Sequence, residues 1–98
     1  MNILRITAKV NPQKEEELKQ ALKSALDKTS IKFKEVKKCC SKNLFEENFV
    51  HIEQEWANEA DLELYLQSKD YKYLIGAITV LGELVEQKII NALSVNEI

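Results

Sequence analysis

The chain has 98 residues, an ordinary size for one domain, and 45% of them are hydrophobic and 31% charged. With only two glycines and one proline, this composition excludes collagen-like and low-complexity chains and predicts a single domain over residues 1–98. The 14 basic and 16 acidic residues leave a net charge of −2, which disfavours nucleic acid as a partner. No apolar run is long enough for a membrane span and no signal-peptide pattern opens the chain, so we expect no membrane contact and a cytoplasmic location.

The sequence also argues against metal ligation and disulfide bonding. Cys39 and Cys40 are adjacent, and neighbouring residues of a strand point to opposite faces, so an ordinary disulfide between them is excluded. His51 is the only histidine, and no CxxC motif is present. We therefore predict that no metal is bound.

The first predicted element is a strand over residues 2–10, where hydrophobic and polar residues alternate as in a strand with one buried face. A helix is predicted to follow, with Asn11 as its N-cap and Pro12 in the first helical position. One apolar stripe runs along this helix and predicts packing on a flat surface. The residues of the stripe are Leu18, Ala21, Leu22, Ala25 and Leu26.

A lysine-rich extended segment is predicted over residues 31–41, and residues 42–48 have the composition of a hairpin turn. The returning strand over 49–56 alternates again. One face is predicted to carry Val50, Ile52, Gln54 and Trp56, and the other Phe49, His51, Glu53 and Glu55.

The last third of the chain predicts two helices and a strand. Asn58 is the expected cap of the first helix and Ser68 that of the second, which should end at Gly82. The final strand is expected over residues 84–95.

This order of elements predicts an α+β fold of the ferredoxin-like split βαβ type, with a four-stranded antiparallel sheet and helices on one face. The lysine-rich strand should lie at a sheet edge, where lysine prevents edge-to-edge pairing. The uncovered face mixes apolar residues such as Ile3 with charged residues such as Arg5. We therefore predict a homodimer that packs sheet to sheet.

Residues 49–82 resemble the antibiotic biosynthesis monooxygenase family. The similarity consists of a strand that ends in Trp56, a short helix with Tyr65, and then Ser68 and Tyr71 at the start of a second helix. The family contains cofactor-free oxygenases of quinols and anthrones, haem-degrading enzymes and proteins that only bind small metabolites. The resemblance implies a dimeric α+β barrel with its pocket between sheet and helices, and no cofactor.

The resemblance also implies a site. Trp56, Tyr65 and Tyr71 match the pocket-lining motif and are the predicted catalytic residues, although aromatic residues at this spacing can equally be core packing. The predicted substrate-binding residues are Asn2, Leu62, Ile75 and Ile78. Strand parity places Asn2 on the face that the helices cover.

The chain departs from the family pattern at three positions. Tyr65 stands where a histidine is usual, Ile75 where haem-degrading members have a histidine, and Gln54 where a carboxylate is frequent. Haem degradation is therefore disfavoured, and the predicted function is cofactor-independent oxygenation of a quinol-like or enolisable aromatic molecule. The alternatives are a non-catalytic small-molecule-binding or interaction domain, and a small-metabolite isomerase.

His51 is the one side chain whose ordinary pKa lies near neutrality, which makes it the obvious candidate for a base. Its parity opposes that of Trp56, so we predict that it lies on the uncovered face beside a carboxylate partner. The isomerase alternative would need His51 to face inward.

Overall fold

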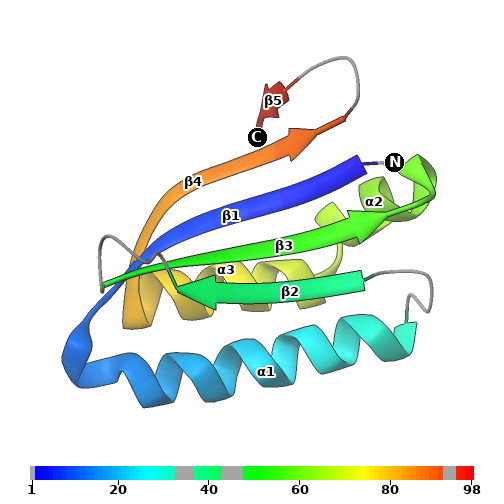
Figure 1. Cartoon of the computed structure of the whole chain (residues 1–98). Helices are drawn as coiled ribbons and strands as arrows, with labels where there is room; N and C mark the ends of the chain where they lie inside the picture. Colours follow the sequence, from blue (N-terminus) through cyan, green and yellow to red (C-terminus); the bar gives the residue numbers. More distant parts are fainter. Residues whose placement is uncertain (1, 33–36, 43–47, 92–94) are drawn as a thin grey trace.

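The computed structural model of the chain describes residues 2–32, 37–42, 48–91 and 95–98, and the side chains of 30–32 and 37–42 lie outside the description. A sheet forms one layer, and helices α1 (Glu15–Lys32) and α3 (Lys69–Leu81) form a second layer against one of its faces (Figure 1). The short helix α2 (Glu59–Leu66) lies beyond the end of the sheet, close to the N-terminus.

The sheet has the strand order β2-β3-β1-β4-β5, and every neighbouring pair is antiparallel. Its strands are β1 (Asn2–Val10), β2 (Lys37–Lys42), β3 (Phe49–Trp56), β4 (Gly82–Ile90) and the short β5 (Val95–Glu97). The four long strands with helices on one face confirm the predicted α+β ferredoxin-like fold. The edge position of the lysine-rich strand β2 is confirmed as well.

Some predicted boundaries are wrong. Helix α1 runs to Lys32, so Ile31 and Lys32 are helical and not extended, and the predicted turn 42–48 lies mostly outside the described residues. The predicted last strand over residues 84–95 falls on two elements, because β4 ends at Ile90 and a separate strand, β5, begins at Val95.

The three predicted caps are confirmed. The Asn11 side chain accepts a hydrogen bond of 3.0 Å from the Gln13 N–H, and Pro12 opens the single 3-10 turn, η1 (Pro12–Lys14), that leads into α1. Asn58 Oδ1 likewise accepts from the Ala60 N–H at 2.9 Å. Ser68 Oγ accepts from the Tyr71 N–H at 3.2 Å. These side chains satisfy backbone donors that the helix itself leaves unpaired.

The core lies between the helices and the inner face of the sheet. The alternation in β3 is confirmed, because its even-numbered residues are buried and its odd-numbered residues are only half-buried. The fully or nearly fully buried hydrophobic residues of the strands are Leu4, Ile6, Ala8, Val10, Val50, Ile52 and Trp56. Those of the helices are Leu18, Leu22, Ala25, Leu26, Leu62, Tyr65, Tyr71, Leu74 and Ile78.

A bulge interrupts the pairing of β1 with β4. Thr7 is paired with Glu86, but the next residue, Ala8, is paired with Leu84, so that Val85 is an extra residue in β4. The extra residue changes the parity of the strand. Val85 is 51% exposed, whereas the preceding residue, Leu84, packs against the core.

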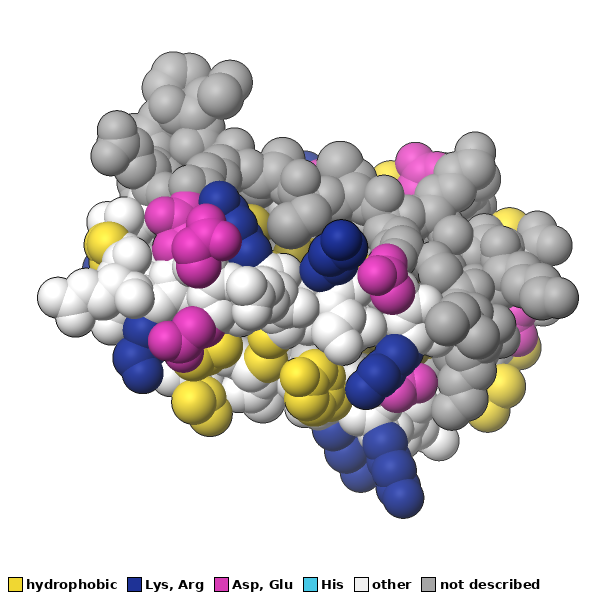
Figure 2. Space-filling model, turned by 90° about the horizontal axis from the view of Figure 1, so that it is seen from below, with side chains coloured by type: hydrophobic (Ala, Val, Ile, Leu, Met, Phe, Trp, Pro, Cys, Tyr) yellow, Lys and Arg dark blue, Asp and Glu magenta, His cyan; other side chains and the backbone are white. Residues whose placement is uncertain are grey.

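The outer surface of the helices is polar in character. Seen from this side, acidic and basic side chains are interspersed with separate hydrophobic ones (Figure 2). Among the residues that the structure describes, no helix combines the length and the apolar character needed to cross a membrane.

Candidate functional site

Three aromatic side chains form a buried cluster where β3 meets α2 and α3. The ring of Trp56 stacks on that of Tyr65, with centroids 5.0 Å apart, and the Tyr71 ring contacts Tyr65 edge to face at 5.3 Å. Their exposed fractions are 2%, 0% and 6%, respectively. The structure therefore brings together the three residues predicted to be catalytic, although they come from three different elements.

Ser68 explains how the two tyrosines are held. It lies between α2 and α3, where its Oγ donates to the carbonyl of Tyr65 at 2.6 Å and accepts from the N–H of Tyr71. One hydroxyl thus joins the last turn of α2 to the first turn of α3. This connection fixes the relative position of the two phenol rings.

The four predicted substrate-binding residues surround this cluster to different degrees. Leu62 and Ile78 are buried in the same core, and Ile75 packs against it while half-buried. Asn2 is half-buried and is the strand partner of Trp56. Their contact with a substrate remains a prediction, because burial in the core is also what packing alone requires.

A buried polar chain adjoins the aromatic cluster. Gln54 is fully buried on β3, and its Nε2 lies 3.4 Å from the Tyr65 hydroxyl. Thr29 of α1 is also fully buried; a side-chain hydrogen bond joins it to Tyr65, and its own hydroxyl donates to the Ala25 carbonyl at 3.0 Å. The core therefore holds an amide, a phenol and a hydroxyl in one hydrogen-bonded row.

The sequence contains signals for two of these polar residues that the predicted site did not include. Thr29 continues the apolar stripe of α1, four residues after Ala25, and Gln54 shares the strand face of Trp56. Gln87 gives no such signal. The Tyr71 hydroxyl donates to Gln87 Oε1, and the β4 bulge is what brings this amide to the inner face.

Burial changes the acid–base character of both phenols. It raises the pKa of Tyr65 above the ordinary value, an effect that the hydrogen bonds with Thr29 and Gln54 reduce. Burial also raises the pKa of Tyr71 well above that value, and the charge of an ionised Tyr65 would add to the shift. Both side chains are therefore neutral at physiological pH, and they can donate hydrogen bonds but cannot act as bases.

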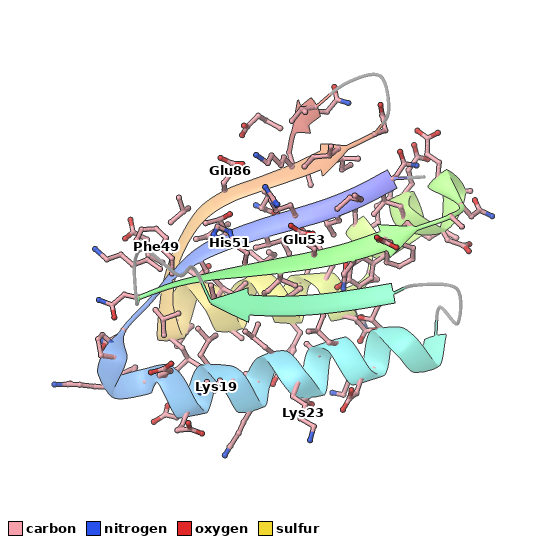
Figure 3. The ribbon with its side chains drawn as sticks, viewed as in Figure 1. Lys19, Lys23, Phe49, His51, Glu53 and Glu86 are labelled. Atoms are coloured by element: carbon pink, nitrogen blue, oxygen red, sulfur yellow. The ribbon has the colours of Figure 1, made fainter. Side chains whose placement is uncertain are left out.

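His51 lies on the uncovered face of the sheet, as predicted, together with Glu53 and Glu86 (Figure 3). Among the side chains that the structure describes, its partner is not the predicted carboxylate but Thr7, its neighbour on β1, whose hydroxyl lies 3.0 Å from Nδ1. Glu53 instead forms an ion pair with Arg5. His51 therefore does not face inward, as the isomerase alternative would require.

A shallow cleft of about 290 Å³ lies at the other end of β1. It is lined by Lys9, Val10, Asn11, Pro12, Lys14, Asn48, Val80, Leu81, Gly82 and Glu83. None of these residues belongs to the predicted site.

Within the described ranges, no three His, Cys, Asp or Glu side chains come close enough together to hold a metal ion.

The fold is shared with several solved structures. A protein from Deinococcus radiodurans that is provisionally named an antibiotic biosynthesis monooxygenase is 19% identical over all of this chain and 92% of its own, with a TM-score of 0.76. One with the same provisional name from Nitrosomonas europaea is 13% identical over 96% of this chain and all of its own, with a TM-score of 0.69. A conserved Bacteroides thetaiotaomicron protein of unknown function, described as a possible oxidoreductase, is 18% identical. The match covers 91% of this chain and 94% of that protein, with a TM-score of 0.76.

No family model matches the sequence, and no curated protein is significantly similar to it. The solved structures nevertheless confirm the resemblance at the level of the fold. The chain has the α+β fold of proteins named as antibiotic biosynthesis monooxygenases, over nearly its whole length. Since one fold serves many activities, the function has to be argued from the site.

Proposed function

We propose that the protein is a cofactor-independent monooxygenase that oxidises a quinol-like or enolisable aromatic molecule, with Trp56, Tyr65 and Tyr71 as the wall of its pocket. The observation that carries the proposal is the buried aromatic cluster between the sheet and the helices. Such a cluster can hold an aromatic ring by stacking and exclude water from it. The shared fold supports a monooxygenase-like activity in general, and the aromatic cluster supports the substrate class.

The proposed reaction needs no bound redox group. The substrate loses a proton, its anion passes one electron to dioxygen, and recombination of the two radicals forms a hydroperoxide. Loss of water from the hydroperoxide then leaves a carbonyl. A methylene group and dioxygen thus give a carbonyl and water, so that one oxygen atom enters the product and the substrate supplies all four electrons.

In this proposal the protein stabilises the substrate anion. The Tyr71 hydroxyl donates to the neutral amide oxygen of Gln87 in the ligand-free protein. An oxyanion is a stronger acceptor than an amide oxygen and would take the place of Gln87. Because Tyr71 stays protonated at neutral pH, its donor is available throughout the reaction.

The described polar residues of the cluster include no base with a pKa near neutrality. The substrate must therefore ionise without a base from the protein, and its anion must pass an electron to dioxygen readily, which favours quinols and anthrones over simple phenols. The same observation favours a second candidate function, a domain that binds such molecules without oxidising them. A conventional acid–base isomerase has no support here, because His51 lies on the opposite face.

Oxygen uptake distinguishes the two candidates. We expect saturable uptake with anthrones or quinols above their autoxidation, and a loss of about 100-fold in kcat for Tyr71→Phe, the usual effect of removing one donor to an oxyanion. Tyr73→Phe is the matched control, because Tyr73 also lies on α3 but is 49% exposed. Uptake that is unchanged in Tyr71→Phe would contradict the proposed role of this phenol. Binding without uptake would establish the non-catalytic candidate.

We propose further that the uncovered sheet face is the interface of a homodimer. Ile3 and Ile90 are strand partners and half-buried at one end of this face, and the half-buried ring of Phe49, the partner of Lys9, lies at the other end. Four of the charged residues on this face are paired within the chain, Arg5 with Glu53 and, at 2.8 Å, Lys88 with Glu86. Apolar ends and two internally neutralised charge pairs lower the electrostatic cost of covering this face with a second copy.

Sedimentation equilibrium tests the homodimer. The wild type should be a dimer at micromolar concentration, and Ile3→Glu should weaken association at least 100-fold, since it places an unpaired carboxylate in the interface. Val80→Glu adds the same charge on α3, at a residue that is 75% exposed, and should leave the dimer intact. A monomeric wild type, or equal weakening by both variants, would refute this interface.

A further inference from the structure

The side-chain amide of Gln54 is unusual because only one of its ends is used. The residue is fully buried, and its Nε2 lies 3.4 Å from the Tyr65 hydroxyl. Its Oε1 is buried as well, yet it has no hydrogen-bond donor among the residues whose side chains are described. A buried amide oxygen without a donor is costly, so such an atom calls for a ligand or a function.

The direction of the neighbouring hydrogen bonds decides which end of the amide is open. Gln54 Nε2 donates to the Tyr65 hydroxyl at 3.4 Å, and this hydrogen bond lowers the pKa of Tyr65, as a donor to the phenol oxygen does. An amide that turns its N–H toward Tyr65 turns its carbonyl oxygen away from it. Gln54 Oε1 is therefore the open acceptor.

From this arrangement we infer that Gln54 selects the ligand, by accepting a hydrogen bond from a hydroxyl group that the aromatic ligand carries in addition to its ionising oxygen. The inference rests on the proposed function, because it concerns the same pocket. It narrows the ligand class to aromatic molecules with at least two oxygen substituents, one of which is a hydroxyl donor. A methoxy group at the second position has no proton to offer and should be rejected.

The geometry of β3 suits a ligand of this kind. Gln54 and Trp56 are two residues apart on the same strand face, a separation of about 7 Å along the strand. This is comparable with the length of two fused aromatic rings. A ligand whose ring lies against the stacked Trp56 and Tyr65 can therefore place a distant hydroxyl at Gln54.

Trp56 also provides the measurement, since it is the only tryptophan of the chain. The probes are naphthoresorcinol (1,3-dihydroxynaphthalene) and its 3-O-methyl ether, titrated under nitrogen so that oxidation cannot occur. We expect quenching of Trp56 fluorescence to show at least tenfold tighter binding of the diol. Gln54→Leu should abolish this preference, because leucine has a similar size but no acceptor.

A second measurement separates ligand selection from a structural role. If the Gln54 oxygen is kept for a ligand, Gln54→Leu should raise the urea midpoint of the ligand-free protein, because the variant no longer buries an unsatisfied polar atom. Gln87→Leu is the matched control: it removes an amide whose oxygen accepts from Tyr71, so it should lower the midpoint and keep the preference for the diol. A lowered midpoint in Gln54→Leu, with the preference retained, would overturn the inference.

The outcomes also separate this inference from the proposed function. Diol-selective binding without oxygen uptake would refute the oxygenase and support the role of Gln54. Oxygen uptake with equal affinity for diol and ether would support the oxygenase and refute the role of Gln54. Failure of both probes to bind would refute the pocket itself and the inference with it.

Discussion

Gly82→Ala should destabilise the protein by about 2–3 kcal/mol, at the upper end of the usual cost of overpacking. A Cβ atom at this position would lie 2.3 Å from the carbonyl oxygen of Lys9, far closer than van der Waals contact. The oxygen is a backbone atom and the Cβ is bonded directly to the backbone of Gly82, which opens β4 beside the end of β1, so neither atom can move by a side-chain rotation. The clash can therefore be relieved only by separating the two strands. Urea unfolding of the variant measures the loss.

The other glycine of the chain provides the control. Gly76 lies inside α3, and a Cβ atom built there meets nothing within 4 Å. Gly76→Ala should therefore stabilise the protein by about 0.5–1 kcal/mol, because alanine favours the helix and costs less entropy on folding. If Gly82→Ala were as stable as the wild type, the close approach of β1 to β4 would be wrong.

The protein should lose stability steeply above pH 10 because of its two buried phenols. In the unfolded chain a tyrosine ionises with a pKa of about 10, whereas burial raises the pKa of both Tyr65 and Tyr71 in the folded protein. Above pH 10 the unfolded state thus binds fewer protons than the folded state, and the free energy of unfolding falls as the pH rises. Below pH 10 both states keep the proton and this contribution is constant.

Each phenol approaches about 1.4 kcal/mol per pH unit well above pH 10, but in the unfolded chain it is only half ionised at pH 10, so that the pair contributes up to about 2 kcal/mol between pH 10 and 11. Urea midpoints from pH 8 to 11 measure the slope. Tyr71→Phe should remove about half of it, whereas Tyr73→Phe, which removes a half-exposed phenol from the same helix, should leave it unchanged. Equal slopes in all three proteins would show that the phenol of Tyr71 is not buried.

The same two phenols connect stability with the proposed function. Their burial keeps them neutral, and a neutral phenol is what can donate to a substrate oxyanion. It also leaves the site without a base of its own. The proposed oxygenase therefore depends on a substrate that ionises without a base from the protein. The proposed role of Gln54 would restrict the substrates further, to those that carry a second hydroxyl group.

Local patterns in the sequence correctly predicted much of the fold. The caps at Asn11, Asn58 and Ser68 were predictable because each side chain satisfies a backbone donor within three residues. The alternation in β3 was predictable because side-chain direction along a strand has a period of two. The same parity correctly placed Gln54 with Trp56 and His51 on the opposite face.

Other features depended on contacts between distant segments. The bulge beside Val85 arises from the register of β4 on β1, and it moved Gln87 to the inner face, where it accepts from Tyr71. The end of β4 at Ile90 and the pairing of β5 likewise follow from strand register. The partner of His51 was mispredicted because the neighbouring carboxylate, Glu53, pairs across the sheet with Arg5.

The sequence by itself thus determined the element order, the fold class and which residues face inward, because propensity, capping and periodicity act over a few residues. Only the tertiary structure decided which inward residues meet. Trp56, Tyr65, Thr29 and Gln87 come from β3, α2, α1 and β4, and no local pattern sets the distances between them. The direction of the hydrogen bonds around Tyr65, and with it the open oxygen of Gln54, exists only because these elements pack together.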